Sequence, residues 1–145
     1  MIGLLQRVTE SRVIVDGSVV GEIGQGIMVL VGMEQGDGHD QMRRLLDRLL
    51  GYRVFEDDQG RMNLSVADIE GGVLLVPQFT LAADTRKGRR PSFSSAMPPD
   101  QAGVLFSEMY AHARKAYPRV ASGCFGADMK VELVNDGPVT FWLQV

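Results

Sequence analysis

Two short segments carry the polar groups best suited to chemistry. The first, residues 77–81 (Pro-Gln-Phe-Thr-Leu), follows an apolar run and brings a side-chain amide, Gln78, and a hydroxyl, Thr80, to its end. The backbone N–H groups of residues 78–80 could bind an oxyanion, and the Thr80 hydroxyl could act as a nucleophile or position a water molecule. The plainer interpretation is a strand that simply continues, with Thr80 on its polar face.

The second segment, residues 135–140 (Asn-Asp-Gly-Pro-Val-Thr), places Gly137 and Pro138 between two apolar runs. Glycine has no Cβ, so the peptide can approach a ligand closely, and the proline ring restricts the backbone beside it. A rigid pair of this kind makes a wall that rejects side chains by collision and so distinguishes enantiomers. A tight turn favours a cis bond before proline, which otherwise occurs in about 5–6% of cases. An ordinary reverse turn accounts for the same residues.

The chain has a net charge of −3 and a pI near 5.3, so a nucleic acid would have to be held by a local basic patch. The densest basic stretch is residues 86–90, which surrounds Gly88 with four cations: Arg86, Lys87, Arg89 and Arg90. These side chains could contact phosphates, and Phe93 just beyond them could stack on an unpaired base. A solvated loop is the alternative.

The sequence offers few of the usual catalytic sets. His39 and His112 are the only histidines, and both are expected at the surface. A Ser-His-Asp triad built from distant residues stays open, but no G-x-S-x-G segment supports one. With a single cysteine, Cys124, the chain has no recognisable metal-ligand cluster and no internal disulfide, which fits a reducing compartment. Cys124 itself is expected to be small and buried, and no cofactor or metal is expected.

The spacing of apolar residues predicts a mixed α/β fold. Strands are expected over residues 2–8, 12–20, 27–31, 73–76, 129–134 and 139–145. Asp16-Gly17 is a hairpin-type turn. The 145 residues suit one domain, with sheets on one side and two helices packed against them.

Two amphipathic helices are predicted from apolar stripes at helical spacing. The stripes are Met42, Leu45, Leu46, Leu49 and Leu50 in the first helix, and Ala102, Leu105, Phe106, Met109 and Ala113 in the second. Asp37 or Asp40 would cap the first helix, and Gly51 would end it. Residues 98–100 would begin the second helix, which would stop at Pro118.

The first seven residues, Met-Ile-Gly-Leu-Leu-Gln-Arg, lack the basic start and long apolar run of a signal peptide. No apolar stretch approaches the ~20 residues that are needed to span a bilayer. We therefore expect a cytoplasmic protein.

Together these segments resemble the bacterial D-aminoacyl-tRNA deacylases. The resemblance covers the whole chain and rests on residues 6–8, 51–55, 62–64, 78–84, 90–93 and 135–145. It implies a cytoplasmic homodimer whose subunit, residues 1–145, is a single deacylase domain: a three-layer β/β/α sandwich with barrel-like mixed sheets and two main helices. It also implies an enzyme that hydrolyses the ester between a D-amino acid and the terminal adenosine of tRNA, and that removes glycine misloaded on alanine tRNA.

The resemblance also assigns residues to roles. Gly137 and Pro138 would form a cis dipeptide inserted into the partner subunit's site, where their parallel carbonyls exclude L side chains. Arg7 would hold this dipeptide in its inward orientation. The remaining site residues would surround the substrate: Gln78, Phe79 and Thr80 at the ester, Phe125 and Met129 at the terminal adenosine, and Arg86, Lys87, Arg89 and Arg90 along the tRNA backbone.

One position departs from the family. The pentapeptide usually begins with serine, and this chain has Pro77 in that place, so no residue-77 hydroxyl or N–H can take part in the chemistry. Proline here also resembles a sister family, the animal-type deacylases that remove L-alanine from threonine tRNA. Arg7 and Phe79 favour the D-specific group, since the sister family differs at both.

An activated ester needs little help, so orientation and a few oxyanion donors could supply most of the acceleration. The hypothesis is that N–H groups around Phe79 and Thr80 bind the oxyanion while water attacks, with assistance from the terminal ribose 2′-hydroxyl. A Thr80 nucleophile is the rival mechanism. A function of a different class is a non-catalytic nucleic-acid-binding module that uses residues 86–90.

Overall fold

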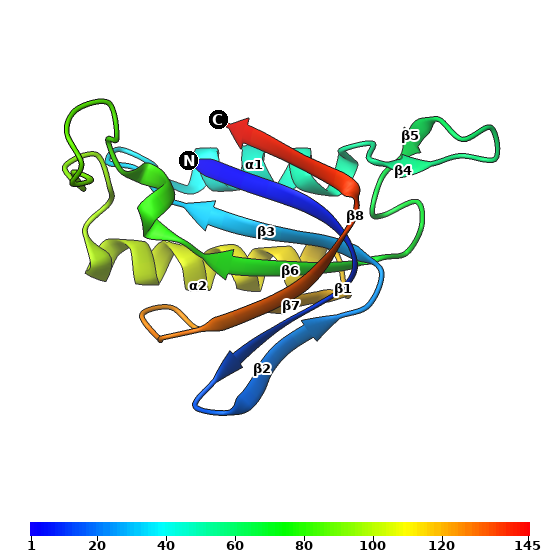
Figure 1. Cartoon of the computed structure of the whole chain (residues 1–145), viewed down its shortest axis with the longest axis horizontal. Coiled ribbons are helices and arrows are strands. Elements are labelled where there is room, and N and C mark those ends of the chain that lie inside the picture. The colour runs from blue at the N-terminus through cyan, green and yellow to red at the C-terminus, as the bar shows by residue number, and fades with distance from the viewer.

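The architecture is organised around one long strand, β1 (Ile2–Val15), in a computed structural model that describes all of residues 1–145. The elements that follow are β2 (Ser18–Ile23), β3 (Gly26–Gly32), α1 (His39–Gly51), β4 (Phe55–Glu56), β5 (Met62–Leu64), β6 (Gly72–Pro77), the 3₁₀ helix η1 (Phe79–Ala82), α2 (Pro99–Ala116), β7 (Val120–Ser122) and β8 (Lys130–Gln144) (Figure 1). Six strands form one mixed sheet in the order β2-β1-β3-β6-β7, with β8 paired to β1. The short strands β4 and β5 make a separate hairpin.

β1 is a single strand where the sequence predicted two. Its first half pairs antiparallel with β3 and its second half with β2, while β8 runs along nearly all of it. The polar pair Thr9-Glu10 does not end the strand, because shifts of register in the pairing with β8 absorb the irregularity. The predicted turn is confirmed: Asp16 and Gly17 have φ values of 49° and 78°, as a tight hairpin requires.

β8 is likewise one strand, although the sequence predicted two strands with a break at residues 135–138. Gln6 of β1 pairs with Thr140, and Val8 pairs with Asn135, so Arg7 alone lies opposite four residues of β8, 136–139. The extra residues are not paired with β1 and form a large bulge in β8. Gly137 and Pro138 lie in this bulge and are exposed.

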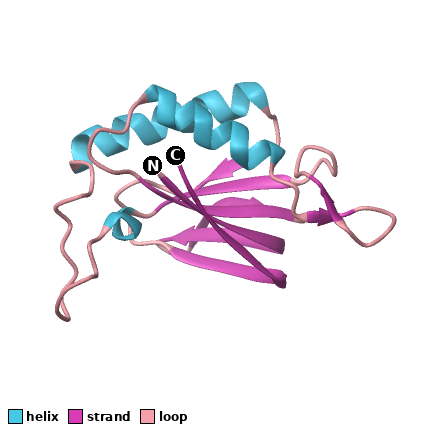
Figure 2. Ribbon diagram, turned by 90° about the horizontal axis from the view of Figure 1, so that it is seen from above, coloured by secondary structure: helices cyan, strands magenta, loops and turns pink.

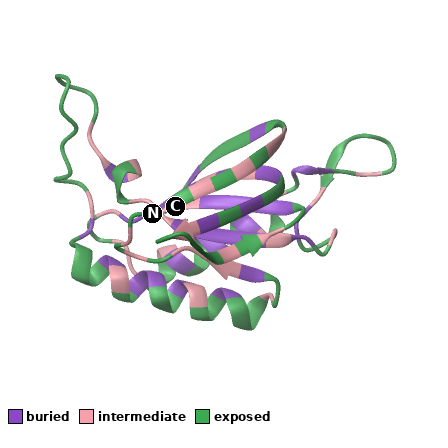
Figure 3. Cartoon of the chain, turned by 60° about the horizontal axis from the view of Figure 1, so that its bottom comes forward, coloured by how far each residue is buried: buried purple, intermediate pink, exposed green.

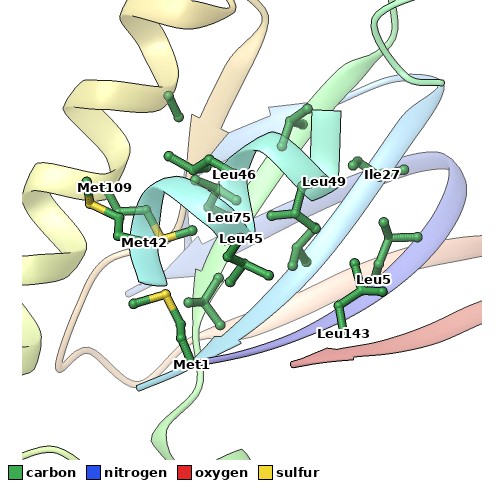
Figure 4. Packing of buried hydrophobic residues seen from close by; sticks show 14 of the residues in the cluster. Met1, Leu5, Ile27, Met42, Leu45, Leu46, Leu49, Leu75, Met109 and Leu143 are labelled. Carbon is green, nitrogen blue, oxygen red and sulfur yellow. The ribbon is translucent and has the colours of Figure 1, made fainter. Parts of the chain in front are cut away.

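β3 and β6 lie side by side in parallel at the centre of the sheet and are buried on both faces. Their continuous apolar runs predict this environment. Alternate residues enter two different cores: Ile27, Val29, Val73 and Leu75 face the helices, and Met28, Leu74 and Val76 meet Val8 and Val13 inside the curved sheet. Figure 4 shows the larger core, where side chains of α1 and of the sheet strands point toward one another.

Both helices cover the same face of the sheet (Figure 2). Of the predicted apolar stripes, α1 buries all but the half-buried Leu50, and α2 buries every member. The buried residues are Met42, Leu45, Leu46 and Leu49 from α1, and Ala102, Leu105, Phe106, Met109 and Ala113 from α2. The predicted cap of α1 is wrong, because Gly38 is the N-cap and its N–H is bonded by a side chain one turn later. Asp37 instead accepts an N–H from the preceding turn, and Asp40 lies inside the first turn of the helix.

The sheet rolls back on itself until β2 comes against β7. Gly21 permits this approach, because a Cβ there would lie 2.4 Å from the carbonyl oxygen of Ser122. The helices, the central strands, and β2 with the adjoining parts of β1 and β8 form three layers around the two cores. The predicted β/β/α fold with a barrel-like mixed sheet and two helices is confirmed. No helix combines the length and the apolar character needed to traverse a lipid bilayer.

Candidate active site

A pocket of about 590 Å³ opens where β6 ends. Ten of its fifteen lining residues are hydrophobic, so it suits a flat, largely apolar group such as a nucleobase. Gln78 and Phe79 enter it from the end of β6 and the start of η1, and Phe125 and Met129 enter from the segment between β7 and β8. Four residues that the sequence singled out, from segments about 50 positions apart, therefore line one cavity.

The backbone beyond β6 leaves two N–H groups without an acceptor. The N–H of Gln78 makes the last bond of the sheet, to the carbonyl oxygen of Val31 at 2.8 Å. It is therefore not free to bind an oxyanion, and the prediction that residues 78–80 all offer an N–H is wrong for Gln78. The N–H groups of Phe79 and Thr80 begin η1 and donate to no other group of the chain.

No imidazole or carboxylate of the chain is hydrogen-bonded to the Thr80 hydroxyl, although Glu34 and Asp84 line the same cavity as Thr80. This hydroxyl accepts a hydrogen bond from the Gln78 amide nitrogen at 2.5 Å, and Thr80 borders a second cavity, of about 500 Å³, together with Trp142. His39 is bonded to Glu108 at 3.0 Å on the surface, and His112 is exposed on α2. In the structure, Thr80 thus orients the Gln78 amide and has no partner of the kind a nucleophile requires.

Pro77 fits the end of β6 because β7, the neighbouring strand on one side, does not extend as far as Pro77. The N–H of Val73 faces β7 and bonds to Arg119, and the carbonyl oxygen of Leu75 accepts from Gly123. Pro77 is the next residue to face this way, and β7 has already ended at Ser122. The missing N–H costs no ladder bond, and the ring becomes part of the pocket wall.

The Gly137–Pro138 bond is cis, and Gly137 has a φ of +143°. Neither residue lines the 590 Å³ pocket of its own chain. The dipeptide is therefore exposed on β8 and lies outside the cavity that holds Gln78 and Phe79.

Two side chains hold the bulge from opposite ends. The guanidinium of Arg7, which is only 7% exposed, donates to the carbonyl oxygens of Asp136 at 2.9 Å and Val54 at 2.6 Å. Asn135 accepts the N–H of Val139 at 2.7 Å through its side-chain oxygen. Sequence reasoning gave Arg7 a role but gave none to Asn135, although an amide side chain just before a break in a strand is a signal for this kind of bridge.

The basic stretch forms an exposed loop between η1 and α2, which stands out from the body of the protein (Figure 3). Arg86 makes a bidentate pair with Asp84, with N–O distances of 2.9 and 2.7 Å. These bonds from Arg86 hold the pKa of the Asp84 carboxyl well below its usual range. The other three cations, Lys87, Arg89 and Arg90, have no acidic partner in the chain and remain available for an anionic ligand.

Cys124 is exposed, so the prediction that it is a small buried residue is wrong. It lies in the turn between β7 and β8, where its neighbour Phe125 takes the place against α2 and the pocket. No group of three or more His, Cys, Asp or Glu side chains is arranged to hold a metal ion.

The fold and the pocket define a class: one mixed, nearly closed sheet, two helices on one face, and a site at the end of the central parallel strands. The sequence model of the family described as "D-Tyr-tRNA(Tyr) deacylase" matches residues 4–144. The chain belongs to this family and is an enzyme of the deacylase class, so the family predicted from its motifs is confirmed.

Similar proteins support the assignment. The D-aminoacyl-tRNA deacylase of Thioalkalivibrio sulfidiphilus is 60% identical, with 100% of this chain and 97% of the relative aligned, and that of Pseudomonas putida is 60% identical with both chains fully covered. A solved structure described as "c-Myc DNA Unwinding Element Binding Protein" has a TM-score of 0.95 at 38% identity, covering 100% and 99% of the two chains. A probable eukaryotic D-amino acid tRNA deacylase has a TM-score of 0.85 at 20% identity, covering 99% and 98%, and shares the fold.

Proposed function

We propose that this protein hydrolyses the ester bond between a D-amino acid and the terminal adenosine of tRNA, releasing the free amino acid and the tRNA. The observation that carries this proposal is the apolar pocket at the end of β6, with the unpaired N–H groups of Phe79 and Thr80 beside it. The adenosine would occupy the pocket between Phe125 and Met129. The ester would then lie near the two N–H groups.

In the proposed reaction, the oxygen of a water molecule adds to the ester carbonyl carbon. The two N–H groups stabilise the negative oxygen that forms, and Gln78 presents its amide to the same region, oriented by Thr80. The ester C–O bond then breaks, and the departing 3′-oxygen takes a proton that the neighbouring ribose 2′-hydroxyl relays from the attacking water. No side chain has to act as a general acid or base, which fits the surface positions of both histidines.

Chirality would be enforced by Gly137 and Pro138 acting in the site of a partner subunit. Three features support this: the dipeptide is exposed, it is fixed at both ends by Arg7 and Asn135, and it lies outside its own chain's pocket. In this proposed homodimer, Trp142 of the same strand, which is 51% exposed, would lie at the interface between the subunits. An L side chain would collide with the dipeptide, and a D side chain would point away from it.

This filter has a consequence for the range of substrates. A wall made of backbone excludes L side chains and does not select among different D side chains, so we expect many D-amino acids to be accepted. Glycine has no side chain to collide, so glycine misloaded on alanine tRNA would also be cleaved. The single domain of residues 1–145 would perform this proofreading in the cytoplasm, with tRNA contacts from Lys87, Arg89 and Arg90 and with no cofactor.

The decisive experiment compares D- and L-tyrosyl-tRNA at the same substoichiometric concentration of the protein. The proposal expects multiple turnovers on the D ester and a rate on the L ester that is lower by about two orders of magnitude or more. Similar rates on both esters would refute the D-specific assignment. Binding of tRNA in stoichiometric amounts without turnover would indicate a binding module instead, and preferential cleavage of L-alanyl-tRNA(Thr) would indicate the animal-type activity.

A further inference from the structure

A pair of aromatic rings lies in solvent at the mouth of the pocket. Phe79 of η1 and Phe93 of the basic loop have ring centroids 5.1 Å apart and planes inclined by 53°. The two residues are 57% and 42% exposed, although both line the 590 Å³ cavity. Their mutual contact leaves each ring with surface free, and exposed aromatic surface beside a polar rim is characteristic of a binding site.

The loop that carries Phe93 is tied down close to its base. The backbones of Asp84 and Ser92 exchange two hydrogen bonds, of 2.8 and 3.1 Å, so that residues 85–91 form a closed tip. Beyond this closure, the Ser95 hydroxyl donates to the carbonyl oxygen of Ala82. Phe93 lies between the two ties, so its position at the pocket mouth is fixed, with the cationic tip beside it.

We propose that Phe93, backed by Phe79, stacks on the unpaired nucleobase immediately 5′ of the esterified adenosine, and that Lys87, Arg89 and Arg90 contact the adjoining phosphates. This inference rests on the proposed function, because it places the esterified adenosine in the pocket. A single-stranded RNA end combines the two chemistries that the site offers, flat bases for aromatic rings and phosphates for unpaired cations. An apolar peptide would use the rings but would have no use for three cations.

In this proposal, successive parts of the RNA end occupy the pocket, the two aromatic rings and the loop tip, in that order. Phe79 and Phe93 are exposed residues of the pocket lining, and Phe93 belongs to the basic loop. The chain that continues from the adenosine would pass these rings before it reaches the loop tip. Arg86 takes no part in binding phosphate, because its guanidinium is already paired with Asp84. It serves as a brace for the loop.

The test uses three small esters in place of tRNA: 3′-D-tyrosyl-adenosine, the D-tyrosyl ester of the dinucleotide cytidylyl-adenosine, and the same dinucleotide with an abasic first residue. Stacking on one base is expected to raise kcat/KM of the dinucleotide ester about tenfold over the nucleoside ester, mainly through KM. The abasic ester, which keeps the phosphate, is expected to lose most of this gain.

The Phe93→Ala variant is expected to bring the ratio of kcat/KM between dinucleotide and nucleoside esters down to about one, whereas Phe93→Tyr retains it. A ratio that survives in Phe93→Ala, or an abasic ester as good as the cytidine ester with the wild-type protein, would overturn the stacking subsite. These outcomes differ from a failure of the proposed function, in which the wild-type protein would hydrolyse none of the three esters. Because the abasic comparison uses only the wild-type protein, it decides the question even if a variant fails to fold.

Discussion

The side-chain oxygen of Asn135 accepts a hydrogen bond from the backbone N–H of Val139 at 2.7 Å, across the exposed dipeptide Gly137–Pro138. The Asn135 amide nitrogen donates in turn to the hydroxyl of Thr140 at 3.0 Å. The bulge is therefore closed at its base by one side chain of its own strand, while Arg7 ties it to β1. A part that rejects substrates by collision has to be rigid, and these bonds supply the rigidity.

Replacing Asn135 tests this relationship. In Asn135→Ala the dipeptide loses its bridge, and we expect the ratio of kcat/KM for D- over L-tyrosyl-tRNA to fall about tenfold, with a loss of about 1 kcal/mol in the free energy of unfolding. Asn135→Asp keeps an oxygen that can accept the Val139 N–H and should retain most of the selectivity. An unchanged D/L ratio in Asn135→Ala would show that the bridge does not position the dipeptide.

Gly137→Ala is expected to disturb the bulge more severely. A Cβ at this position would lie 2.6 Å from Cγ2 and 2.9 Å from the nitrogen of Val139, and the φ of +143° is one that L residues rarely adopt. We expect about 1–3 kcal/mol of destabilisation, measured by denaturant unfolding, together with increased hydrolysis of L-tyrosyl-tRNA. The matched control is Gly24→Ala, because a Cβ there meets no atom within 4 Å. A stable, fully selective Gly137→Ala protein would contradict both the geometry and the filter.

Much of the fold was predictable because it depends on local pattern. The helical stripes, the turn at Asp16-Gly17 and the buried run of β6 each follow from periodicity or from the conformational preferences of a few neighbouring residues. The continuity of β8 was not predictable in this way. It depends on pairing with β1, which joins Arg7 to a position 129 residues along the chain. Local sequence shows only the glycine and proline, which are ordinarily signs that a strand has ended.

The candidate site was predictable to a similar extent. Phe125 and Met129 were placed near Gln78 by resemblance to a family, and the pocket brings them together. Which individual hydrogen-bonding groups are paired and which are free could not be predicted from the sequence. Whether the Gln78 N–H is free depends on the register of β3 against β6, and the pairing of Arg86 depends on how Asp84 turns within the loop.

Thr80 distinguishes the two mechanisms. If backbone N–H groups and water perform the reaction, Thr80→Val removes only the acceptor that orients Gln78, and the single-turnover rate should fall about tenfold or less, with tRNA binding retained. Thr80→Ser keeps the hydroxyl and should be close to wild type. A loss of several orders of magnitude in the single-turnover rate of Thr80→Val, with binding intact, would identify the hydroxyl as the nucleophile and contradict the backbone mechanism.

The cations of the loop should differ in their effect on the salt dependence of binding. Each side chain that contacts a phosphate of a single strand contributes about 0.7 to the slope of log K against log salt concentration. Arg89→Ala and Arg90→Ala should each reduce this slope by roughly that amount. The measurement is the affinity for uncharged tRNA between about 50 and 200 mM salt, a range over which the effect is large. Arg86→Ala is the internal comparison, because Arg86 is already neutralised by Asp84 in the free protein. It should leave the slope nearly unchanged while lowering the affinity, since the loop loses its brace. If all three variants reduced the slope equally, the Asp84–Arg86 pair would have to open on binding, and Arg86 would be a phosphate contact like its neighbours.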